Sequence, residues 1–135
     1  MTLTINGMRL PDILVEAIRS GTWRAPERAE IYVEVFGEPA DVPEFYDERM
    51  MRRENDGWDS VSVDDYACVP QEPGNLGVDL DRSVIIAGLG PDMPVVLDYR
   101  QSLESPRVLY LAGNHPHWVE VASDIEDLFD KLGIR

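Results

Sequence analysis

The chain has 135 residues, 44% of them hydrophobic, and its 26 acidic and 12 basic side chains give a net charge of −14. A chain of this length and apolar content can bury its own core, so we expect a single domain over residues 1–135. Cys68 is the one cysteine of the sequence, which excludes an intramolecular disulfide and fits a reducing compartment.

The N-terminal residues do not combine a basic start with an apolar run, as a signal peptide would. The longest apolar runs are a few residues, whereas a membrane-spanning helix requires about 20. We therefore expect a cytoplasmic protein that does not engage a membrane.

The acidic excess is uneven along the chain. The net charge is −1 over residues 1–37, −10 over residues 38–81 and −3 over residues 82–135. A field of this sign repels the phosphates of nucleic acids and attracts basic proteins. The charge thus argues against nucleic-acid binding, and it leaves two interpretations: a surface that only aids solubility, or one that binds a basic partner.

Helical periodicity marks the beginning of the chain. Apolar residues from Leu10 to Ile18 lie on one face of a predicted helix, which Pro11 opens and Gly21 ends. A second helix is predicted between Pro26 and Gly37, although its apolar residues also alternate weakly, as in a strand.

A third helix is predicted to begin at Asp41, because Glu44 three residues later resembles a capping box. It would run to Met51 with a Glu48–Arg52 ion pair along one side. Between residues 55 and 82 the pattern weakens, with a possible strand at Val61–Val63 or Ala67–Val69.

The last third of the chain predicts strands and a final helix. Short apolar or alternating segments separated by turn residues indicate an antiparallel meander; they are Val84–Leu89, Val95–Tyr99, Arg107–Leu111 and His117–Val121. A helix from Ile125 to Leu132 follows, with Ser123 as its predicted N-cap and Gly133 as its end. The predicted fold is α+β: an antiparallel or mixed central sheet of about four to six strands, packed against N-terminal helices and a C-terminal helix.

The order of these segments from Val84 to Ile134 resembles the SUKH superfamily, which includes fungal cell-wall-assembly regulators and many bacterial immunity proteins. The resemblance is carried by Val-Ile-Ile-Ala-Gly-Leu-Gly at 84–90, Pro-Val-Val-Leu-Asp-Tyr-Arg at 94–100, Pro-Arg-Val-Leu-Tyr-Leu at 106–111, Trp-Val-Glu-Val-Ala at 118–122 and the helix at 125–132. None of these motifs is catalytic.

The resemblance implies a protein-binding domain and not an enzyme. Bacterial members of the family often neutralise toxins, commonly nucleases or deaminases. We therefore predict an immunity-type protein that occludes the active site of a cognate basic toxin, as a monomer or weak dimer and without a cofactor. The alternative is a regulatory or scaffold domain that binds a peptide or small ligand in a groove beside the sheet.

The predicted contact surface lies between Glu54 and Tyr66, where aromatic residues are surrounded by acids, an arrangement that suits an Arg- or Lys-rich partner. The candidate partner-binding residues are Glu54, Asp56, Trp58, Asp59, Asp64, Asp65 and Tyr66. The alternative interpretation makes Trp58 a core residue and the acids a solvated surface.

Other motifs favour structural roles. For Asp98-Tyr99-Arg100 we expect Asp98 to cap a turn or pair with Arg100, and Tyr99 to pack inward. Gly88-x-Gly90 precedes a proline and predicts a turn instead of a phosphate loop. His115-Pro116-His117 lacks partners at metal-ligand spacing, so no metal site is predicted, and the acidic surroundings of Cys68 disfavour a nucleophile.

Overall fold

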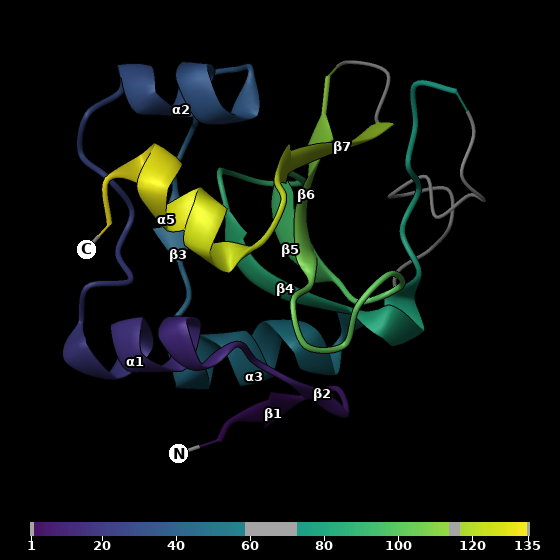
Figure 1. Ribbon diagram of the computed structural model, residues 1–135. Coiled ribbons are helices and arrows are strands. Elements are labelled where there is room, and N and C mark those ends of the chain that lie inside the picture. The colour runs from purple at the N-terminus through teal and green to yellow at the C-terminus, as the bar shows by residue number, and fades with distance from the viewer. Residues whose placement is uncertain (1, 59–72, 114–116, 135) are drawn as a thin grey trace.

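The computed structural model describes residues 2–58, 73–113 and 117–134 (Figure 1). Within these residues, a five-stranded antiparallel sheet has the order β3-β4-β5-β6-β7. Its strands are β3 (Glu44–Phe45), β4 (Ser83–Gly88), β5 (Pro94–Asp98), β6 (Arg107–Ala112) and β7 (His117–Ala122). The predicted α+β fold and its four C-terminal strands are confirmed.

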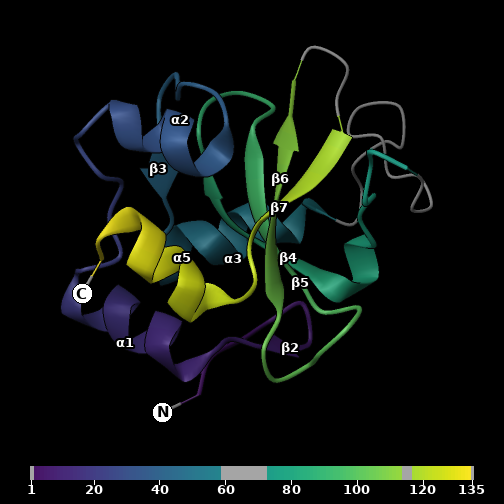
Figure 2. The same ribbon diagram turned by 45° about the horizontal axis from the view of Figure 1, so that its top comes forward.

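Helices cover the sheet mainly from one side, where α1, α2 and α5 lie together in both views (Figures 1 and 2). The helices are α1 (Asp12–Ser20), α2 (Glu30–Phe36), α3 (Glu48–Asp56) and α5 (Ile125–Leu132), and a short 3-10 helix, η2, spans Leu80–Arg82. A small hairpin of β1 (Thr4–Ile5) and β2 (Met8–Arg9) precedes α1.

The core lies on both faces of the sheet because β4 and β5 are buried along their whole length. The strand register places Val84, Leu97 and Val108 on the face that meets the helices. Ser83, Asp98 and Arg107 share the opposite face. The apolar run at 84–89 therefore belongs to an inner strand, flanked by β3 and β5.

The expected helix start at Asp41 is wrong. Glu44 and Phe45 instead form a strand that pairs with Gly88 and Ala87 of β4. The helix begins at Glu48, where the Asp47 side chain caps it by accepting a hydrogen bond from the Met50 amide at 2.9 Å. This segment pairs with a strand some forty residues away instead of starting a helix, because strand pairing satisfies the backbone hydrogen-bonding groups of both segments. The predicted Glu48–Arg52 pair is present at 3.2 Å.

Two helix starts also differ from the prediction. The second helix begins at Glu30 rather than at Pro26, and it ends at Gly37 as expected. The final helix is capped by Asp124 instead of Ser123, since the Asp124 carboxylate accepts from the Asp127 amide at 2.8 Å. The predicted left-handed stops at Gly21 and Gly133 are confirmed.

Several predictions lie outside the described residues: the possible strands at Val61–Val63 and Ala67–Val69, Cys68, and the His115-Pro116 pair. Among the described helices, none has the length and apolar character needed to cross a membrane.

Candidate functional site

An acidic cleft of about 390 Å³ lies at the β3 side of the sheet, beside the turn that joins β4 to β5. Its lining combines apolar side chains, such as Val42, Tyr46 and Met93, with carboxylates. Three separate parts of the chain supply the carboxylates: Asp41 and Glu44 from the segment around β3, Glu54 from α3, and Asp92 from the turn.

The segment that carries Asp41 and Glu44 is held against β4 by its backbone. The Asp41 amide donates to the Leu89 carbonyl at 2.8 Å, and the Tyr46 amide donates to the Ile86 carbonyl at 3.1 Å. Glu44 pairs with Gly88 between these two contacts. The two carboxylates therefore project from a fixed backbone.

The opposite wall of the cleft is the turn at residues 90–93. The turn packs tightly on the first wall, because a Cβ on Gly90 would lie 2.8 Å from the Asp41 Cβ and 3.0 Å from the Met93 sulfur. Asp92 adopts the left-handed conformation, with φ of 58°, which aspartate tolerates better than most residues. The expectation that Gly88-x-Gly90 leads into a turn is confirmed.

Glu54 reaches the cleft because the next residue, Asn55, fastens the end of α3 to β4. The Asn55 side chain is buried. Its amide nitrogen donates to the Ile85 carbonyl at 2.8 Å, and its oxygen accepts from the Ile85 backbone N–H at 2.9 Å. Asn55 thus replaces a strand neighbour at the part of β4 that β3 does not reach.

The lining of the cleft holds four carboxylates and no basic side chain. Glu54 lies 3.9 Å from Arg53, and both side chains are well exposed. Asp41 and Glu44 form no ion pair with any described residue. Such carboxylates attract a cation of suitable shape.

The predicted contact surface is only partly represented in the cleft. Glu54 lines it, and Asp56 is exposed at the end of α3. Asp59, Asp64, Asp65 and Tyr66 lie outside the described residues.

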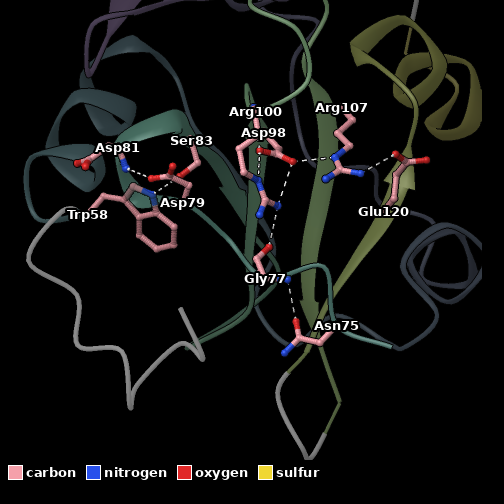
Figure 3. A network of polar contacts seen from close by, with 10 residues as sticks. All are labelled: Trp58, Asn75, Gly77, Asp79, Asp81, Ser83, Asp98, Arg100, Arg107 and Glu120. Carbon is pink, nitrogen blue, oxygen red and sulfur yellow. Dashed lines mark hydrogen bonds and ion pairs between the residues drawn. The ribbon is translucent and has the colours of Figure 1, made fainter. Parts of the chain in front are cut away.

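Trp58 is a core residue, which corrects its assignment as an exposed aromatic anchor. It is 2% exposed, and its indole nitrogen donates to the Ser83 hydroxyl at 2.8 Å (Figure 3). Its ring meets that of Trp118 edge-on. An indole in an acidic setting offers no sequence signal that separates an anchor from a core residue, since both roles use the same large apolar surface.

A second polar cluster, centred on Asp98, lies on the same face of the sheet as Ser83 (Figure 3). Asp98 is 0% exposed and accepts hydrogen bonds from Arg100 Nε at 2.9 Å and Arg107 Nε at 2.7 Å. Arg100 also donates to the Gly77 carbonyl at 3.1 Å, which fastens the segment before η2 to the sheet. The predicted pairing of Asp98 with Arg100 and the inward packing of Tyr99 are confirmed.

The Asp98 cluster is internally neutralised. Burial alone would raise the pKa of Asp98, but the hydrogen bonds from Arg100 and Arg107 outweigh it and hold the pKa below that of an ordinary aspartate. Both arginines bind this carboxylate and are largely covered, and Arg107 also lies 3.8 Å from Glu120. This arrangement fits a structural role.

Sequence reasoning missed Arg107 of the cluster and Asp41, Glu44 and Asp92 of the cleft. Arg107 could have been found, because a meander with a turn between residues 99 and 106 places it opposite Asp98. The cleft residues carry no such signal, since they come from three segments that only the tertiary fold brings together.

The described residues define an α+β protein with an acidic cleft at one side of its antiparallel sheet. Comparison of the chain with family models, curated proteins and solved structures found no match. The resemblance to the SUKH superfamily therefore stays a prediction that rests on the motifs from Val84 to Ile134.

Proposed function

We propose that this chain is an immunity-type protein, which binds a cognate basic protein such as a nuclease or deaminase toxin and covers its active site. The observation that carries the proposal is the acidic cleft, with four carboxylates and no cation in its lining. A nucleic-acid-directed enzyme needs a basic groove for its substrate, and an acidic surface is complementary to such a groove.

The distribution of ion pairs supports this choice of surface. Asp12, Glu30, Glu34, Asp98 and Asp127 each lie within 4.0 Å of a basic side chain, away from the cleft. Asp41 and Glu44 lack such a contact among the described residues. Part of the acidic excess of residues 38–81 is therefore left without a basic partner at the cleft.

The resemblance to the SUKH superfamily points in the same direction. Within this proposal the protein acts in the cytoplasm, without catalysis of its own, as a monomer or weak dimer. Asp59, Asp64 and Asp65 stay predicted contact residues for the basic partner.

The test is protection of growth. The proposal expects a toxic domain to be encoded beside the gene, and co-expression of the chain with that domain should restore growth. A variant with Asp41→Asn, Glu44→Gln and Glu54→Gln should lose protection, whereas Glu16→Gln, Asp81→Asn and Glu104→Gln, which remove the same charge elsewhere, should not.

Binding measurements on the purified pair sharpen the test. Association should slow steeply as salt rises, because exposed charges act mainly on the rate of encounter. Affinity that is insensitive to salt and to the cleft variant would contradict the proposal and favour a ligand-binding regulatory domain.

A further inference from the structure

The acidic cleft has a neighbour, and one short segment separates the two. A second cleft of about 450 Å³ lies on the other side of residues 40–43, with Pro26, Tyr32, Pro39 and Pro43 in its lining. Asp41 lines both clefts. We call this second cleft the proline cleft.

Val42 lines the acidic cleft and is 61% exposed, and its chain neighbours Asp41 and Pro43 line the proline cleft. It is exposed on a backbone that is held in place, because the Asp41 amide bonds to Leu89 on one side and Glu44 pairs with Gly88 on the other. Pro43 restricts the chain further. A partner that contacts Val42 therefore loses little additional entropy in ordering this segment.

An exposed apolar side chain is ordinary by itself. Here it belongs to a cleft lined by carboxylates, next to a second cleft whose lining contains prolines, a tyrosine and Glu27. An apolar centre with a charged rim is the usual composition of the energetically dominant part of a protein interface.

The carboxylates also select the shape of the cation. Among the described residues, no three potential ligands gather closely enough to hold a metal ion. Carboxylates spread over a cleft suit a long side chain with several donors. The planar guanidinium of arginine presents five N–H groups and is weakly hydrated, and its methylene stem can lie along Val42 and Met93.

We propose that residues 40–44 form the anchor point for a basic segment of a protein partner, which inserts an arginine into the acidic cleft and packs an apolar neighbour over Val42 into the proline cleft. This inference rests on the proposed function, since it names the chemistry that the acidic cleft recognises. It adds that an apolar contact at Val42, and not charge alone, determines which basic partner binds.

The experiment uses the full chain labelled with ¹⁵N and an acetylated pentapeptide, Gly-Arg-Leu-Arg-Gly, as the probe. Peptide binding should shift the amide signals of Val42, Gly88 and Gly90, with an affinity in the millimolar range, on the order expected for so small a ligand. A peptide with citrulline in place of both arginines keeps the shape and removes the charge, and it should bind at least about tenfold more weakly.

Val42→Ser should weaken binding of the arginine peptide about fivefold, the size typical of an interface residue that matters. Leu103→Ser is the matched control, because Leu103 is 69% exposed beside Glu104 but lies in the β5–β6 connection at the opposite end of the sheet. It should bind as the unmodified chain does. A dispersed amide spectrum of each variant verifies that the fold is retained.

Three results would overturn the inference: no shift at millimolar peptide, shifts that map away from the clefts, or unchanged binding by Val42→Ser. If the Val42 variant binds the peptide normally while neutralisation of the carboxylates abolishes growth protection, the anchor is wrong and the proposed function stands. If neither the cleft carboxylates nor Val42 affects protection, the proposed function fails with it.

Discussion

The two carboxylate clusters of this protein differ in how their charge is balanced. Asp98 is buried and shared between two arginines, so its charge is compensated inside the fold. The cleft carboxylates lie at the surface without a basic residue in the lining. The charge of Asp98 therefore stabilises the fold, whereas the charge of the cleft gives the surface a negative potential that a basic molecule can recognise.

Removal of the buried carboxylate should produce the largest effect. Asp98→Asn leaves Arg100 without its ion-pair partner and Arg107 with only Glu120, 3.8 Å away; the two arginine side chains are 21% and 11% exposed. We expect the free energy of unfolding to fall by about 3–5 kcal/mol, as measured by urea denaturation. Asp56→Asn, at an exposed position, should change it by no more than about 0.5 kcal/mol. Equal stability of the two variants would refute a structural role for the Asp98 cluster.

Asn55→Ala tests the contact that carries Glu54 to the cleft. It leaves the buried backbone N–H and carbonyl of Ile85 without their partner, and the free energy of unfolding should fall by about 1–3 kcal/mol for each unsatisfied group. The exposed stretch of β4 should also promote self-association, which analytical ultracentrifugation would detect. Asn6→Ala removes a bond to the same side chain at 3.2 Å and should have the smaller effect; the reverse order would contradict this assignment.

The pKa of Asp98 predicts how stability responds to acid. Because this pKa is lower in the folded than in the unfolded chain, its stabilisation is complete above the unfolded value of about 3.9 and is lost as the pH falls through the folded value. The stability difference between the unmodified chain and Asp98→Asn should therefore shrink below about pH 4. Denaturation curves measured from pH 7 downwards check this, and a constant difference would contradict it.

The smallest expected effect has the opposite sign. Asp41→Asn with Glu44→Gln removes two charges that no described basic residue compensates, so stability should rise, by at most about 0.5 kcal/mol. Added sodium chloride should reduce the difference in unfolding free energy between the variant and the unmodified chain, because salt screens the repulsion between the carboxylates. Marked destabilisation in thermal melts would show that these carboxylates hold the fold together, and it would remove the contrast between the two clusters.

Local sequence patterns predicted much of the fold. Short apolar runs bounded by turn residues located β4, β5 and β6, and alternation located β7, which has one partly exposed face. Helix ends were predictable at Gly21, Gly37 and Gly133, where a left-handed residue is required.

The same reasoning failed where two local signals competed. Ser123 and Asp124 both precede an acidic residue at capping distance, and the choice of Asp124 depends on a shift of one residue. Asp41 and Glu44 resemble a helix start, yet the free edge of β4 recruits this segment as a strand. The pattern around Asp41 carries no information about that edge, because β4 lies some forty residues further along the chain.

Periodicity and composition were enough to predict the strand order of the last third, the terminal helix and the sign of the surface charge. The burial of Trp58 and the meeting of Asp41, Glu44, Glu54 and Asp92 at one cleft emerge from the three-dimensional fold. Burial and electrostatic potential depend on which remote segments become neighbours, and no local pattern encodes that.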